Sequence, residues 1–119
     1  MACTAALLVS SVPLSWVQAV AYKQEPVKIP QFLMTATASS EESKSDTCYA
    51  SYAIDGDTGT MWHTRWSSTA SAPHWLSVDL GRTVELAKLT YLPRQDGNQN
   101  WYVQEYEISV STDGQTYTP

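Results

Sequence analysis

The chain is poor in basic residues, histidine and cysteine, and each shortage argues against a class of function. Only seven of 119 residues are Lys or Arg, against twelve Asp or Glu, and the formal net charge is −5. An acidic surface repels phosphate backbones and anionic lipids, which argues against nucleic acid and membrane partners. The two histidines, His63 and His74, have no further His or Cys at metal-ligand spacing, so the sequence does not predict a zinc site.

The sequence also lacks the signatures of an enzyme. It has no nucleophile-elbow motif for a Ser-His-Asp hydrolase and no recognisable pair of carboxylates in an apolar setting for glycoside hydrolysis. Of its two cysteines, Cys3 lies in the apolar N-terminal segment, and Cys48 has no evident base beside it. We therefore predict a non-catalytic protein in which Cys48 is a small buried residue.

The N-terminal third has the composition of a leader and a linker. Residues 1–21 carry no charge and end on Ala19-Val20-Ala21, the small-residue pattern of a signal peptide, although a positive start is missing. Residues 22–33 contain Pro26 and Pro30 and resemble an extended linker. We predict a signal peptide over 1–21, a linker over 22–33, a domain over 34–119, and a secreted or cell-surface location.

Alternating apolar residues predict short strands in this domain. Residues 34–40 combine β-branched with small side chains, and residues 74–81 and 106–114 alternate apolar with polar positions. Residues 84–92 also alternate, with a change of phase near Ala87 that suggests a bulge. Turn-forming Asp-Gly pairs recur at Asp55-Gly56, Asp96-Gly97 and Asp113-Gly114. The pattern predicts an all-β, antiparallel sandwich or barrel.

Three stretches carry polar groups that could form a site. The tight loop around Asp55, Asp57 and Thr60 offers the oxygens that calcium prefers, but its composition alone favours a plain Asx-type turn. Residues 62–66 read WHTRW and place His63 between aromatic rings, where it is either structural or functional. Arg94 begins an amide-rich loop, RQDGNQN, which is either a solvated surface or a sugar contact.

In order along the chain, AIDGDTGTMWHTRW, PHWLSVDLG, YLPRQDGNQN and YEISVSTDG resemble the discoidin or coagulation factor 5/8 type C domain. The likeness is closest to carbohydrate-binding module family 32 and runs from about residue 35 to the end. It implies a jelly-roll β-sandwich of the galactose-binding-domain type. Such modules accompany secreted or surface enzymes that act on glycosides.

The resemblance also implies two sets of site residues. A structural Ca²⁺ would be held by oxygens of Tyr52, Asp55, Asp57 and Thr60. Terminal galactose or N-acetylgalactosamine would be bound by His63, Arg94 and Asn100. Trp101 stands where many relatives have glycine, so it could stack on the sugar or block the pocket, and we expect it to be the exposed stacking ring. We expect Trp62 and Trp66 to support the pocket from beneath.

The chain also departs from the family pattern at its C-terminal end. It stops before the last strands of the family's sandwich, so we expect a truncated domain with only five protein oxygens for the cation, and a catalytic domain in a longer parent. The expected partner is a glycan. The alternative is a discoidin-type adhesion module that binds protein or membrane through apolar loop tips.

Overall fold

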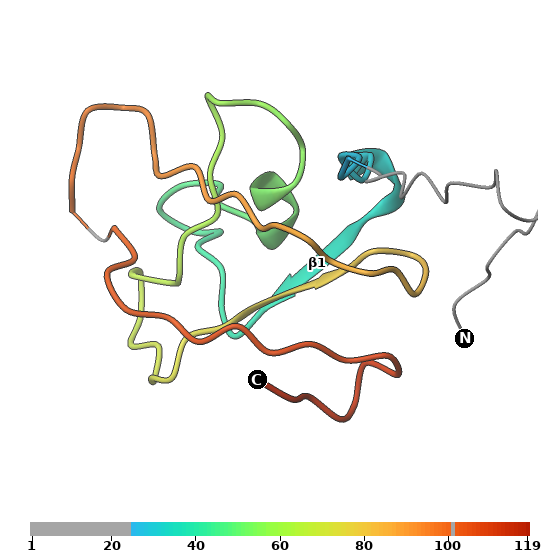
Figure 1. Cartoon of the computed structure of the whole chain (residues 1–119). Coiled ribbons are helices and arrows are strands. Elements are labelled where there is room, and N and C mark those ends of the chain that lie inside the picture. The colour runs from blue at the N-terminus through green and yellow to red at the C-terminus, as the bar shows by residue number, and fades with distance from the viewer. Residues whose placement is uncertain (1–24, 101) are drawn as a thin grey trace, which may run out of the picture.

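The computed structural model describes residues 25–100 and 102–119. The predicted signal peptide, the first residues of the linker and Trp101 lie outside these ranges. The elements within them are the 3-10 helix η2 (Gln31–Leu33), strand β1 (Thr35–Ala38), the 3-10 helix η3 (Ala50–Ala53) and strand β2 (Leu76–Asp79) (Figure 1). None of the helices in this part of the chain has the length and hydropathy needed to span a bilayer.

The two strands form an antiparallel pair. Thr35 lies opposite Asp79, and Ala38 lies opposite Leu76. The paired residues are about forty positions apart along the chain, so the contact between the strands is a distant one. Ser39 extends the pairing beyond β1, since its N–H donates to the Trp75 carbonyl at 2.9 Å and its Oγ accepts the Trp75 N–H at 3.1 Å. The strands predicted within residues 34–40 and 74–81 are confirmed.

A glycine ends β2 where the chain passes close to η2. Gly81 has φ +73°, and a Cβ on it would lie 2.9 Å from the backbone oxygen of Leu33. Another residue type would therefore meet both backbone strain and a steric clash at this position. The glycine lets the chain turn at a point where it comes close to the backbone of Leu33.

The other two predicted strands are largely wrong. Residues 84–92 have no β-pairing, and Leu86 and Leu89 are exposed. In residues 106–114 the pairing is limited to one antiparallel bridge, Val110 with Thr118, across the Asp113-Gly114 turn. Alternation predicts which segments favour an extended backbone, but a strand also needs a partner for its backbone hydrogen bonds, and among the described residues these two segments have only the single Val110–Thr118 bridge.

The buried centre of the described residues consists of Glu42, Cys48 and Ala50. Cys48 is a free thiol and is buried as predicted. Burial raises its pKa, and the negative charge of Asp46 adds to this effect, so the unreactive thiol form is favoured. Ala50 opens η3, which packs against β1 (Figure 1).

Candidate functional site

Hydrogen bonds hold the WHTRW segment to the chain around residues 40–48. The indole N–H of Trp62 donates to the Ser40 carbonyl at 3.0 Å. The backbone of His63 makes two bonds: its N–H donates to the Cys48 carbonyl at 3.3 Å, and its carbonyl accepts the Glu42 N–H at 3.1 Å. The side chain of Trp62 is therefore tied to the chain at Ser40, and the position of His63 is fixed by its backbone.

The imidazole of His63 has a defined orientation. Its Nδ1 lies 2.6 Å from the Thr64 carbonyl oxygen, and because a carbonyl can only accept, Nδ1 carries the proton in this arrangement. In the neutral ring Nε2 is then an acceptor. The Trp66 indole meets the imidazole edge to face, with centroids 4.6 Å apart and planes at 84°.

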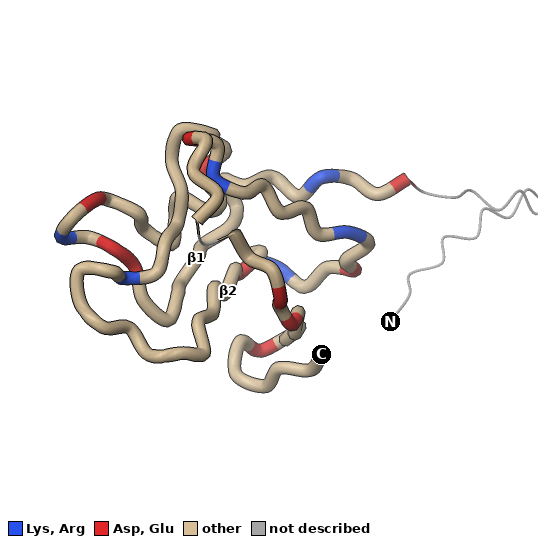
Figure 2. Tube along the Cα trace, turned by 90° about the vertical axis from the view of Figure 1, so that its left-hand side faces the viewer, with Lys and Arg blue, Asp and Glu red and all other residues tan. Residues whose placement is uncertain are grey.

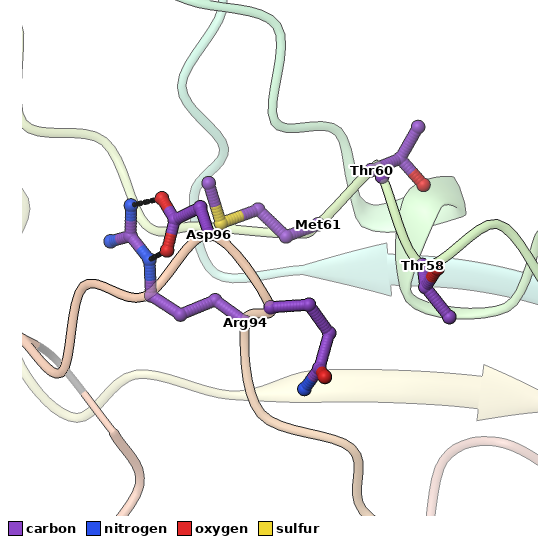
Figure 3. Close-up of a pocket in the computed structure, with 7 residues that line it drawn as sticks. Thr58, Thr60, Met61, Arg94 and Asp96 are labelled. Atoms are coloured by element: carbon purple, nitrogen blue, oxygen red, sulfur yellow. Dashed lines mark hydrogen bonds and ion pairs between the residues drawn. The ribbon is translucent and has the colours of Figure 1, made fainter.

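Arg94 forms a bidentate ion pair with Asp96. Its Nε donates to Asp96 Oδ1 at 2.8 Å and its Nη2 donates to Asp96 Oδ2 (Figure 3). The bond from Arg94, together with the Asn98 N–H, lowers the pKa of the Asp96 carboxyl to about 2, and the same pairing raises the pKa of the guanidinium. The Arg94 side chain is only 16% exposed, so the fork fixes a charge that is largely enclosed.

His63, Arg94 and Asn100 line the same hollow, which has a volume of about 360 Å³. The structure thus brings together three of the four residues predicted to bind sugar, and the fourth, Trp101, lies outside the described residues. The remaining lining residues are Asp46, Met61, Trp66 and Asn98. The hollow therefore combines polar side chains with the apolar surfaces of Met61 and Trp66.

Trp66 and Asp46 are site candidates that the sequence interpretation missed. Trp66 was expected to support the hollow from beneath, but it lines the hollow and is 47% exposed. The sequence signal that could have placed Trp66 in the site was its position three residues after His63. Asp46 comes from the exposed loop 43–47, which the chain order separates from every motif, so no sequence pattern places it beside Arg94.

A smaller hollow of about 140 Å³ adjoins the first. The two hollows share Met61 and Arg94, and the smaller one is completed by Gln95, Asp96 and the loop 58–60. Figure 3 shows the Met61 side chain extending from this loop towards Asp96. The predicted cation loop and the predicted sugar residues are therefore neighbours in space.

The predicted cation loop brings several of its oxygens together. Thr60 Oγ1 lies 2.7 Å from Asp55 Oδ2 and 3.1 Å from the Asp57 carbonyl oxygen. The Asp57 side chain instead accepts the Gly59 N–H at 2.8 Å, which leaves its carbonyl turned towards the threonine. Tyr52 lies in η3, directly before the loop. These hard oxygens fit the donor set of Ca²⁺.

The same loop also forms the Asx turn that the sequence allowed, because Asp55 Oδ1 accepts the Asp57 N–H at 2.9 Å. In the described part of the chain, no three His, Cys, Asp or Glu side chains gather as a metal-binding group. A cation here would therefore depend on carbonyl and hydroxyl oxygens as much as on the two carboxylates.

Comparison with known proteins identifies the family. Residues 35–119 match the F5/8 type C domain. The chain belongs to the F5/8 type C domain family. The family fold is a β-sandwich, and the predicted all-β, antiparallel class is confirmed by the match and by the strand pair of the structure.

Several relatives of this F5/8 type C domain are much larger proteins. The chain is 41% identical over 64 residues to galactose oxidase of Gibberella zeae, a match covering 52% of this chain and 9% of the relative. It is 40% identical over 84 residues to a sialidase of Micromonospora viridifaciens, covering 69% and 13% respectively. An A type blood N-acetyl-alpha-D-galactosamine deacetylase of Flavonifractor plautii is 34% identical over 87 residues, covering 72% and 11%. The chain therefore matches only a small part of each relative.

A solved structure is similar as well. It is the family 32 carbohydrate-binding module of NanJ from C. perfringens, determined in complex with galactose. The match has 52% sequence identity and a TM-score of 0.41, and it covers 45% of this chain and 37% of that chain.

Proposed function

We propose that this F5/8 type C domain is a non-catalytic carbohydrate-binding module that holds terminal galactose or N-acetylgalactosamine in the larger hollow. The observation that carries the proposal is the meeting of His63, Arg94 and Asn100 around one hollow beside the exposed ring of Trp66. Two relatives, galactose oxidase and an N-acetyl-alpha-D-galactosamine deacetylase, are named for sugars of this class.

The chemistry of the lining suits a sugar. Hexose hydroxyls both donate and accept, while one face of the ring presents C–H groups that pack on an aromatic side chain. Trp66 offers that aromatic surface and Asn100 offers both an acceptor and donors. Of the five N–H donors of Arg94, the fork to Asp96 uses two, so others can serve ligand hydroxyls.

We further propose that Tyr52, Asp55, Asp57 and Thr60 hold a structural Ca²⁺. The convergence of the Thr60 hydroxyl with Asp55 Oδ2 and the Asp57 carbonyl supports this site. A cation there would neutralise the carboxylates and rigidify the loop that also borders Met61 and the smaller hollow. It takes no part in any reaction.

Residues 1–21 are proposed to be a signal peptide, residues 22–33 a linker and residues 34–119 the module, in a secreted or surface protein. A single small hollow binds a monosaccharide weakly, because few atoms make contact. Attachment to a larger glycoside-active protein, such as those to which the chain is related, would increase retention on a glycan-rich surface by avidity.

A glycan array followed by titration with galactose tests the proposal. We expect His63→Ala and Arg94→Ala each to weaken binding by about tenfold or more, because each removes a hydrogen-bonding group from the hollow. The chain offers matched controls in exposed residues that do not line it, His74→Ala and Arg82→Ala, which should bind as the parent does. Binding to phosphatidylserine vesicles and to no glycan would instead support the adhesion alternative.

A further inference from the structure

Glu42 is a buried carboxylate outside the residues assigned to the site. Its side chain is fully buried, with 0% exposure, and it has no ion pair within the described chain. Four backbone N–H groups donate to it: Lys44 and Ser45 to Oε1, both at 2.9 Å, and Trp66 and Ser67 to Oε2, at 2.8 and 2.7 Å. A buried charge is tolerated when its acceptor positions are satisfied in this way.

These four bonds join the two edges of the larger hollow. Lys44 and Ser45 belong to the loop that carries Asp46, and Trp66 belongs to the segment that carries His63. The Glu42 backbone adds two more links, since its N–H donates to the His63 carbonyl at 3.1 Å and its carbonyl accepts the Cys48 N–H at 2.9 Å. One residue therefore contacts both chain segments that meet at the hollow.

The arrangement requires an ionised carboxylate. Burial by itself would raise the pKa of Glu42, but the four N–H donors outweigh burial and lower the pKa well below its usual range. A glutamine has the same shape but only one acceptor oxygen, and its NH₂ group would face two N–H donors in either orientation. An amide at this position can therefore hold one edge of the hollow but not both.

We propose that Glu42 is the positioning residue of the sugar hollow, which ties the Asp46 loop to the His63–Trp66 segment. This inference rests on the proposed sugar-binding function. In this role Glu42 does not contact the sugar and acts through backbone hydrogen bonds to the two segments that line the hollow. The neighbouring Glu41 provides a matched comparison, because its side chain accepts one bond, from the Ala50 N–H at 2.8 Å.

The test compares Glu42→Gln with Glu41→Gln at a temperature where both are folded. We expect Glu42→Gln to weaken galactose binding by about tenfold or more, while Glu41→Gln stays within about twofold of the parent. Amide hydrogen exchange should accelerate in Glu42→Gln either at Lys44 and Ser45 or at Trp66 and Ser67, because the amide can accept from only one of these two pairs. Parent-like affinity and exchange in Glu42→Gln would overturn the inference.

If Glu42→Gln does not fold, amide hydrogen exchange in the unmodified protein tests the inference instead. The four amides should exchange slowly and through one common opening, because they share one acceptor group. Exchange of the Lys44 and Ser45 amides at the rate of an unstructured peptide would overturn the inference. If the parent protein binds no galactoside, the proposed function fails, while the exchange measurements still decide whether Glu42 ties the two segments together.

Discussion

His63, Trp66 and Arg94 each have an orientation that a neighbouring group fixes. The Thr64 carbonyl sets the tautomer of His63, the rings of His63 and Trp66 meet edge to face, and Asp96 holds the guanidinium of Arg94 in a fork. Preorganised groups lose little conformational entropy when a ligand binds. At the scale of single residues, the hollow is therefore ready for a small polar ligand.

Trp66 should matter through its ring surface. We expect Trp66→Ala to abolish measurable galactose binding and Trp66→Phe to weaken it by about tenfold or less, because phenylalanine retains an aromatic face. Isothermal titration measures both variants. Trp75→Phe is the control, since Trp75 is also half exposed but does not line the hollow. Equal affinity of the parent and Trp66→Ala would show that the ring does not contact the sugar.

Ser67 offers a prediction about stability. Its hydroxyl oxygen is buried and has no hydrogen-bond partner in the described structure, whereas its N–H donates to Glu42. A buried hydroxyl without a partner costs free energy, so Ser67→Ala should raise the free energy of unfolding by about 1 kcal/mol. Urea denaturation measures the change, with the exposed Ser68→Ala as control. A clear loss of stability in Ser67→Ala would mean that the hydroxyl has a partner in solution.

At the scale of elements, the sequence predicted the segments with local signals and missed those that depend on distant contacts. Local sequence predicted the strand segments at 34–40 and 74–81 and the three Asp-Gly turns. The glycines of all three turns have positive φ. Residues 84–92 show why alternation alone is insufficient, because no partner strand lies beside them in the described chain. Glu42 could not be recognised at all, since its four donors come from two segments and only the structure brings the second one to it.

The turn after Val110 should be sensitive to acid. The N–H groups of Thr116 and Gln115 lower the pKa of Asp113 from 3.8 to about 2, so its ionised form stabilises the folded turn. This stabilisation of the folded turn is complete above the pKa that Asp113 has in the unfolded chain, and it is lost as the pH falls from 3.8 to about 2. We expect the amides of Val110 and Thr118 to lose exchange protection over this range.

The matched variant for this prediction is Asp113→Asn. It should show weaker protection at neutral pH and little further change on acidification, because no carboxyl remains to titrate at this turn. An acid response in Asp113→Asn as large as that of the parent would assign the effect to another carboxylate.

The loop from Asp55 to Thr60 should respond to calcium. A bound ion stabilises the folded state by about 2.7 kcal/mol when its concentration is a hundredfold above Kd, so calcium should raise the Tm of the parent and a chelator should reverse the rise. Thr60→Val removes a proposed ligand and should lose most of this increment. Thr58→Val, in the same loop but outside the proposed ligand set, should keep it. The same increment in both variants would exclude Thr60 as a ligand.

At the scale of the whole molecule, Figure 2 shows acidic and basic positions interspersed along the described trace. The excess of acidic residues gives the net charge of −5 and suits a neutral glycan better than a phosphorylated or anionic partner. Several apolar side chains remain exposed, with Leu89 at 70% and Tyr106 at 72%. Leu89 and Tyr106 do not line the larger hollow, so we assign ligand binding to the hollow and not to these exposed apolar side chains.

The most direct measurement is an NMR titration of the ¹⁵N-labelled chain with galactose. We predict that the signals of the Trp66 indole N–H, the Asn100 side-chain amide and the Arg94 Nε–H shift together along one saturable curve, while the signal of the Trp75 indole N–H does not move. Saturable shifts centred on other residues, or no shifts at concentrations of galactose in the tens of millimolar range, would contradict it.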